Sequence, residues 1–235
     1  MAKKKQIYIN QEVYNIEGIT MDKGYPELTK SNIEKVHDYI ITKSSYAPFK
    51  TGNHVQKYFQ EHAGDISLAT VVTKVILVNT ADSTNLETLL GRNAYERMAK
   101  RIIECGVEDL IKYGSPIDDE LFKKLASWQR MRNNQIQDMN LFIFISKYIT
   151  RASTYSYGGN FYSIMDNVVK NNLGLYNDKS KGIVIPNLNH IRDNFEYSKY
   201  CKILGEIAFK LDVTREMLDH FVWFVFKKEA VADKK

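Results

Sequence analysis

Cysteine, proline and glycine are all scarce in this chain of 235 residues. The two cysteines, Cys105 and Cys201, lie about 100 positions apart, which excludes a CxxC pair, a zinc ribbon and a four-cysteine iron–sulfur loop. Four prolines and 12 glycines are too few for a turn-rich all-β sandwich or for a long linker. We therefore expect a compact chain with two reduced thiols that pack as small apolar groups.

Long apolar runs are missing as well. Unbroken stretches such as 141–145 are far shorter than the roughly 18 residues that a membrane span requires. The basic N-terminus, residues 1–5, leads into no hydrophobic segment, so we expect no secretory signal. These features predict a soluble, cytoplasmic protein with no membrane partner, and no pattern indicates a metal or a cofactor.

Positive charge is modest in amount but concentrated in one place. The formal net charge is +5, and the segment 121–153 contains six basic residues and the single acid Asp138, so it holds the whole excess. A solvated helix surface can acquire such a bias by chance. A surface that faces a polyanion would show it too, and DNA or RNA phosphate is the commonest polyanion. The basic residues are Lys123, Lys124, Arg130, Arg132, Lys147 and Arg151.

Apolar residues recur at helical spacing along most of the chain, which predicts an all-α fold of about nine or ten helices. Residues of N-cap type precede several of these helices, namely Ser31, Asp65, Asp166 and Thr214. The expected helices cover 31–40, 55–62, 68–78, 93–111, 117–126, 133–152, 166–174, 190–209 and 214–226. The expected loops cover 44–52, 79–85, 153–161 and 176–189, the last with a short extended piece at 183–186.

Two residues could carry chemistry, and each also has a plain structural interpretation. Lys147 follows a strongly apolar stretch, and an apolar setting can lower the pKa of a lysine and make its amine a nucleophile. It could equally be a surface lysine whose stem packs on apolar neighbours. Asp166 begins a predicted helix, where a carboxylate can serve a site or simply cap the helix.

Taken together, these residues resemble the helix–hairpin–helix DNA glycosylases. The segment 163–174, Ser-Ile-Met-Asp-Asn-Val-Val-Lys-Asn-Asn-Leu-Gly, follows the family's aspartate segment through its closing Leu-Gly. Lys147 and Asp166 are 19 positions apart, which is the spacing of the 8-oxoguanine branch. The stretch 76–80, Ile-Leu-Val-Asn-Thr, looks like that branch's Ile-Leu-Ser-Gln-Asn-Thr. The resemblance covers roughly 65–226.

The chain also departs from the family pattern. The glycine-containing hairpin that should end at the lysine has no counterpart, because 141–146 contains no glycine. The family's histidine two positions after the aspartate is Val168 here, and the arginine of that helix is Lys170. The four-cysteine cluster of the endonuclease III branch is absent. The chain therefore resembles a divergent member in which phosphate must be bound without the hairpin glycines.

The resemblance implies an architecture and an activity. It implies two helical subdomains on either side of a central cleft, formed by 65–226, which leaves 1–64 as a helical extension. The charged residues from Lys227 onward predict a disordered tail at 227–235. It implies a monomeric DNA glycosylase that excises a damaged or modified base from a nucleotide flipped out of duplex DNA. Lys147 would attack C1′ and form a Schiff base that leads to strand nicking (AP lyase activity). Asp166, with its pKa held low at a helix N-terminus, would stay ionised and stabilise the positive charge on the sugar.

Further residues acquire roles from the same comparison. Arg151 lies one helical turn beyond Lys147 and would point into the same pocket, and Asn79 resembles the residue that fills the gap beside the unpaired partner base. Phosphate binding would fall to Lys123, Lys124, Arg130 and Arg132. Walls for the flipped base could be Tyr155, Tyr157, Phe221 or Trp223, each of which could also be ordinary core.

Other classes of function fit the same residues. A non-catalytic helical module could use the basic segment on DNA or RNA, and an all-α adaptor would bind no nucleic acid. The residues do not identify the excised base, nor do they separate base excision repair from defence against modified phage DNA.

Overall fold

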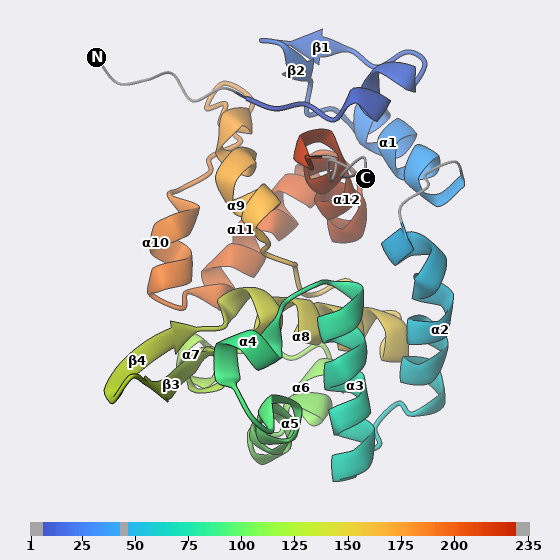
Figure 1. Cartoon of the computed structure of the whole chain (residues 1–235). Coiled ribbons are helices and arrows are strands. Elements are labelled where there is room, and N and C mark those ends of the chain that lie inside the picture. The colour runs from blue at the N-terminus through green and yellow to red at the C-terminus, as the bar shows by residue number, and fades with distance from the viewer. Residues whose placement is uncertain (1–6, 43–46, 229–235) are drawn as a thin grey trace, which may run out of the picture.

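The structure, a computed structural model, describes residues 7–42 and 47–228, apart from the side chains of 47–53 and Arg132, and is mostly helical (Figure 1). This confirms the helical fold class. No helix in the described part of the chain has the length and apolarity needed to cross a membrane. The α-helices are α1 (Lys30–Thr42), α2 (Ala47–Glu61), α3 (Leu68–Ala81), α4 (Leu86–Leu90), α5 (Ala94–Glu104), α6 (Val107–Lys112), α7 (Asp119–Ala126), α8 (Phe142–Tyr157), α9 (Asn167–Asn172), α10 (Leu188–Asp193), α11 (Tyr197–Lys210) and α12 (Arg215–Phe226). Short elements complete the described chain: η1 (Gln11–Asn15), η2 (Leu173–Tyr176), β1 (Met21–Asp22), β2 (Tyr25–Pro26), β3 (Ser127–Arg132) and β4 (Gln135–Asn140).

Helix α8 forms the centre of the molecule. Its apolar side chains are buried on most sides, as the unbroken run 141–145 predicts, and α2, α3, α6 and α7 pack around it. In Figure 1 these helices form the lower half of the molecule, and α9, α11 and α12 lie above α8. Because α8 is held from several directions, side chains on its upper face have fixed positions.

The N-terminal segment packs onto the C-terminal helices. Helix α1 lies against α12, and the Asn10 amide donates a hydrogen bond to the Val225 carbonyl at 2.8 Å. The Tyr25 hydroxyl donates to the Leu175 carbonyl at 3.0 Å. Residues 7–42 are therefore part of the upper half, although the sequence assigned 1–64 to an extension.

A β-hairpin replaces the start of the helix predicted at 133–152. Strands β3 and β4 pair antiparallel from Ser127 opposite Asn140 to Arg132 opposite Gln135. Asn133 and Asn134 join them with φ of 50° and 59°, which is the left-handed pair of a two-residue hairpin turn. Asparagine tolerates this conformation, so the Asn-Asn pair forms the turn between the strands, and α8 begins only after β4, at Phe142.

Other helix boundaries differ from the prediction for local reasons. The helix predicted at 93–111 is divided into α5 and α6 at Gly106, and that predicted at 190–209 is divided into α10 and α11 at Phe195, because both residues have positive φ. Helix α8 continues through part of the predicted loop 153–161 and ends at Gly158, which supplies the left-handed C-terminal residue. Helix α2 begins inside the predicted loop 44–52.

The two thiols are free, and both cysteines are half-buried. Burial raises the pKa of the Cys201 thiol to about 11 and also raises the pKa of Cys105. Neither thiol is therefore an activated nucleophile.

Candidate active site

A cavity of about 530 Å³ lies where α8 meets α12 and the loop that follows α3. Lys147 and Asp166 both line it, together with Arg151 and Trp223. Its volume is typical of small-molecule sites, which range over roughly 300–1,000 Å³. The structure therefore brings together the two residues that the sequence singled out, although they belong to different helical segments.

Lys147 is held by Asp82, a residue that the sequence did not single out. The Lys147 Nζ atom donates to the Asp82 backbone carbonyl at 3.1 Å and lies 3.7 Å from the Asp82 Oδ1 atom. Arg151, one turn further along α8, places its Nη2 atom 3.5 Å from the same carboxylate oxygen. Because Asp82 is the C-cap of α3, both cations also meet the negative end of that helix. Such a pairing across 65 positions has no signal in a single sequence.

Asp166 is both a helix cap and a residue of the cavity wall. Its Oδ1 atom accepts a hydrogen bond from the Val169 amide at 2.8 Å, which makes it the N-cap of α9. Burial nevertheless raises the pKa of Asp166 above its usual value, although the Lys147 charge and the amides of Val168 and Val169 act in the opposite direction. The expectation of a lowered pKa is therefore wrong, because loss of hydration outweighs the helix N-terminus.

Helix α12 contributes two further titratable residues, Asp219 and His220. Burial, together with the nearby Asp166 charge, raises the pKa of Asp219 well above its usual value. Burial also lowers the pKa of His220 well below its usual value, and its Nδ1 atom lies 3.0 Å from the Nδ1 atom of His37 on α1. A carboxylate and an imidazole side by side in the otherwise apolar stretch 217–226 were the available sequence signal for these residues.

Replacing Asp219 with asparagine is expected to raise the stability of the fold at neutral pH. A carboxyl group whose pKa is raised by folding favours the folded state below its unfolded pKa, and this contribution is lost as the pH rises through the folded pKa. Asp219→Asn removes the charge and should raise the melting temperature at pH 8, with a smaller gain at pH 5. About 1 kcal/mol corresponds to roughly 2–4 °C for a chain of this size.

The control is Asp212→Asn. Asp212 is exposed in the turn before α12, and its hydrogen bond with Lys30 lowers its pKa, so this variant should show no gain. A melting temperature for Asp219→Asn at or below that of the wild type at pH 8 would contradict the charge arrangement described for the cavity.

Trp223 presents its ring to the cavity beneath a lysine. The Lys227 Nζ atom lies 3.9 Å from the ring centroid, which is cation–π geometry. Lys227 also lines the cavity, and burial lowers its pKa. Lys227, which the sequence assigned to a disordered tail, is therefore a second amine beside the candidate site.

The remaining aromatic and amide candidates are not among the described residues that line this cavity. The Asn79 side-chain oxygen accepts from the Thr84 hydroxyl and the Leu86 amide, both at 2.8 Å, so it organises the loop between α3 and α4. Tyr155 packs edge-on against Phe59. Tyr157 is half-buried and packs against the core, and Phe221 is fully buried in it.

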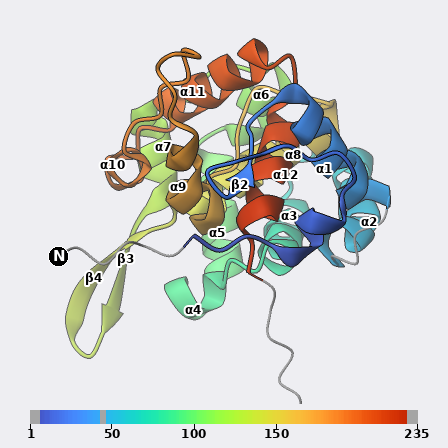
Figure 2. The ribbon, with the colours of Figure 1, turned by 90° about the horizontal axis from the view of Figure 1, so that it is seen from above.

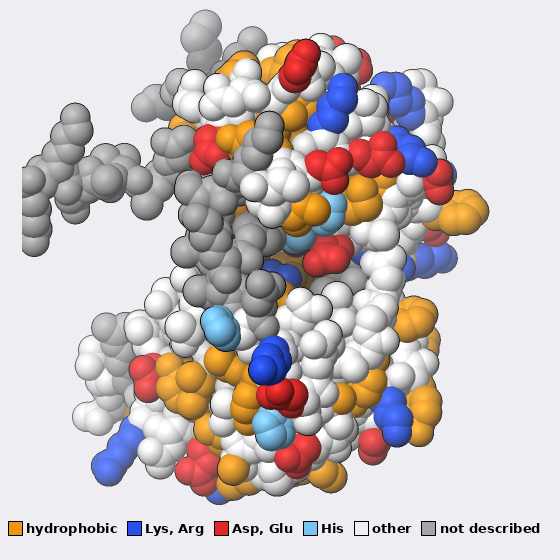
Figure 3. Space-filling view, turned by 90° about the vertical axis from the view of Figure 1, so that its right-hand side faces the viewer, with side chains coloured by type: hydrophobic (Ala, Val, Ile, Leu, Met, Phe, Trp, Pro, Cys, Tyr) orange, Lys and Arg blue, Asp and Glu red, His pale blue; other side chains and the backbone are white. Residues whose placement is uncertain are grey.

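The predicted phosphate-binding residues are distributed over two elements outside the cavity. Lys123 and Lys124 are exposed on α7. Arg130 on β3 donates to the Thr88 carbonyl at 2.6 Å and the Leu89 carbonyl at 3.1 Å, so its guanidinium fastens the hairpin to α4. Arg132 also lies in β3, but its side chain is outside the described residues. On the opposite side of the molecule, the described acidic and basic side chains alternate without a patch of one sign (Figure 3).

Comparison with known proteins places the chain in a family. A family model with the description HI_0787_N, N-terminal domain, matches residues 30–155, which is more than half of the chain. The chain belongs to the HI_0787_N family. No curated protein and no solved structure matches the chain.

The HI_0787_N match covers one wall of the cavity. It spans α1 to nearly the end of α8 and includes Asp82, Lys147 and Arg151. Asp166 and the α12 residues follow the matched segment. Membership of the HI_0787_N family assigns no reaction to the cavity, so its function must be argued from its side chains.

Proposed function

We propose that the protein is a DNA glycosylase that excises a damaged or modified base from duplex DNA, with Lys147 as nucleophile and Asp166 as the assisting carboxylate. The observation that carries the proposal is that Lys147, Asp166 and Trp223 line one cavity of about 530 Å³. Attack on C1′ requires an amine, stabilisation of the charged sugar requires a carboxylate, and stacking of a flipped base requires a flat aromatic side chain. The reaction needs no cofactor and takes place in the cytoplasm, in base repair or in defence against modified phage DNA.

The chemistry begins with proton loss from Lys147. Asp82, whose Oδ1 atom lies 3.7 Å from the Lys147 Nζ atom, is the acceptor for this proton, which leaves Asp166 ionised for the next step. The Lys147 amine then forms a bond to C1′ while the bond from C1′ to the base breaks, and the base leaves with the bonding electron pair and takes up a proton. Opening of the sugar ring gives the Schiff base, from which β-elimination breaks the strand on the 3′ side.

Charge in the cavity matches this sequence of steps. Positive charge develops on the sugar as the base leaves, and an ionised Asp166 stabilises it in a site that excludes most water. Because burial raises the pKa of Asp166, base release should fall on the acid side at a pH above that of an ordinary aspartate, about 3.9.

The test is a panel of duplex oligonucleotides incubated with the protein and then with borohydride. The panel carries 8-oxoguanine, other oxidised and deaminated bases, hypermodified phage bases and a natural abasic site. Release of a base with a trapped covalent adduct supports the proposal. Salt-sensitive binding without base release or adduct would instead assign a non-catalytic DNA- or RNA-binding module, and no binding from 50 to 200 mM salt (about the range that screens phosphate contacts) would leave only an adaptor.

A further inference from the structure

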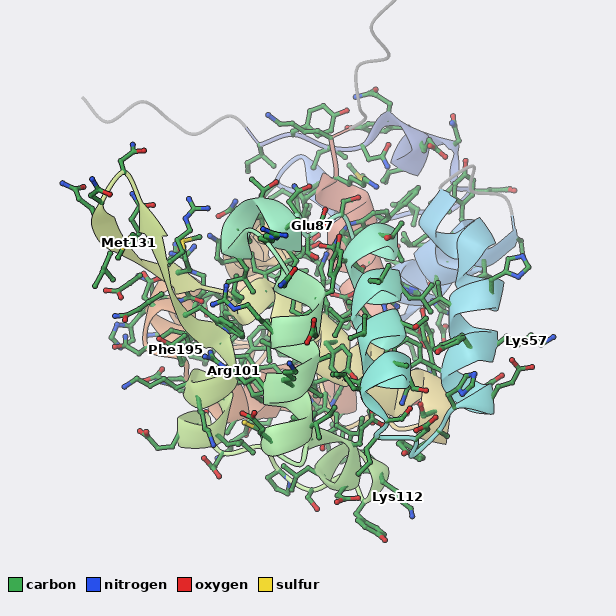
Figure 4. The ribbon with its side chains drawn as sticks, turned by 60° about the horizontal axis from the view of Figure 1, so that its bottom comes forward. Lys57, Glu87, Arg101, Lys112, Met131 and Phe195 are labelled. Atoms are coloured by element: carbon green, nitrogen blue, oxygen red, sulfur yellow. The ribbon has the colours of Figure 1, made fainter. Side chains whose placement is uncertain are left out.

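The hairpin β3–β4 is an arm that projects from the helical body. In Figure 2 it extends beyond the helices on the side where α4 also lies, and Figure 4 shows Met131 towards its outer end. Each strand has six residues, which span roughly 20 Å. The last residue of β4, Asn140, lines the cavity, so the arm begins at the rim of the candidate site.

The base of the arm is fixed to the body. Trp128 is buried, donates to the Leu125 carbonyl at 2.7 Å and is covered by the guanidinium of Arg101, whose carbon lies 3.4 Å from the ring centroid. Arg101 also donates to the Ser127 carbonyl at 2.8 Å, and Arg130 ties the middle of β3 to α4. These contacts fix the base and the middle of the arm, so its outer end has a defined position relative to the helical body.

The outer part of the arm carries an exposed apolar pair. Met131 and Ile136 lie directly opposite each other in the register and expose 74% and 67% of their surfaces. Because strand side chains alternate, they share a face with Gln129, Asp138 and the cavity residue Asn140. Most of the apolar surface of this pair faces solvent, so it is available to contact a partner.

We propose that Met131 and Ile136 form a wedge that enters duplex DNA and unstacks the bases beside the nucleotide held in the cavity. This rests on the proposed function. Methionine and isoleucine are among the side chains that minor-groove proteins insert between base steps, and β-ribbons enter either groove of DNA. The strands of the arm contain Arg130 and Arg132 against the single acid Asp138, and the arm begins at the rim of the cavity, so we take DNA as its partner.

The test compares the double variant Met131→Thr with Ile136→Thr against the wild type. Threonine keeps a high strand propensity and removes the apolar surface. The matched control is Val184→Thr, because Val184 is 58% exposed and is not among the described residues that line the cavity. The probes are a duplex with an abasic site beside 2-aminopurine, whose fluorescence rises on unstacking, and the same labelled strand without its partner.

We expect the wild type and the control to raise the fluorescence of the duplex and to form the borohydride adduct. The double variant should lose the fluorescence rise and trap the duplex at least about tenfold more slowly, with single-strand trapping within about twofold of wild type. Unchanged duplex trapping, an equal loss on both probes, or a change only in the oligomeric state on sedimentation would overturn the wedge. If the wild type unstacks the duplex but forms no adduct, the glycosylase proposal is wrong and the wedge is retained. If the wild type gives neither the fluorescence rise nor the adduct, both proposals are wrong.

Discussion

Asp166→Asn is expected to stop base release while leaving DNA binding unchanged or tighter. The carboxylate acts only as positive charge develops on the sugar, so its loss raises the barrier without weakening ground-state binding. Removing one preorganised group of this kind costs about a hundredfold or more in rate. The measurement is single-turnover base release, with the dissociation constant measured in parallel on the same duplex.

The stability of Asp166→Asn distinguishes a catalytic role of Asp166 from helix capping alone. Asparagine is as good an N-cap as aspartate and keeps the hydrogen bond from the Val169 amide. Burial raises the pKa of Asp166, so the charged form disfavours the folded state as the pH rises through that pKa, and the neutral variant should be at least as stable as the wild type at pH 7.

The matched control is Asp118→Asn. Asp118 caps α7 in the same way, accepting from the Leu121 amide at 2.8 Å, and is not among the described residues of the cavity wall. This variant should release base at the wild-type rate. If Asp166→Asn also releases base at the wild-type rate, Asp166 acts only as the N-cap of α9.

Lys74→Met is expected to destabilise the fold by roughly 3–5 kcal/mol, because it leaves a buried carboxylate without its counter-charge. Lys74 on α3 has no exposed surface, and its Nζ atom lies 3.0 Å from the Glu108 Oε1 atom on α6. The Tyr148 hydroxyl on α8 donates to the same oxygen at 3.1 Å, while the buried Glu108 Oε2 atom has no hydrogen-bond partner among the described residues. The loss is a large share of the total stability of a domain, about 5–15 kcal/mol.

A second variant shows whether the charge is the cause. Lys74→Met combined with Glu108→Leu removes both charges and should recover most of the stability, since apolar replacement of a buried pair is often neutral. Urea unfolding of the wild type, the single variant and the double variant measures this. A double variant no more stable than Lys74→Met would mean that packing volume, and not the unpaired charge, controls the outcome.

The helical part of the fold could be predicted because its signal is local. The apolar run 141–145 requires a buried helix, and α8 is that helix. The hairpin was missed because its strands are mostly polar, and only the pair Asn133 and Asn134 marked the turn. Gly106 divides α5 from α6 with a single residue, which periodicity over a long window does not detect.

The site could be predicted only in part, because it is assembled by tertiary packing. A resemblance in spacing placed Lys147 and Asp166 together, and both line one cavity. Asp82 and Lys227 come from other parts of the chain and reach the site only when the fold brings the ends of α3 and α12 to the cavity beside α8. The raised pKa of Asp166 follows from burial, which a helix-start pattern does not report.

The most direct test of the central claim is to identify the lysine that becomes attached to DNA. The wild-type protein is incubated with a duplex that carries an abasic site, reduced with borohydride and digested, and the modified peptide is located by mass spectrometry. We predict modification at Lys147 alone, abolished by Lys147→Ala and retained by Lys227→Ala. An adduct at Lys227, the other amine that lines the cavity, or undiminished trapping by Lys147→Ala, would contradict the assignment.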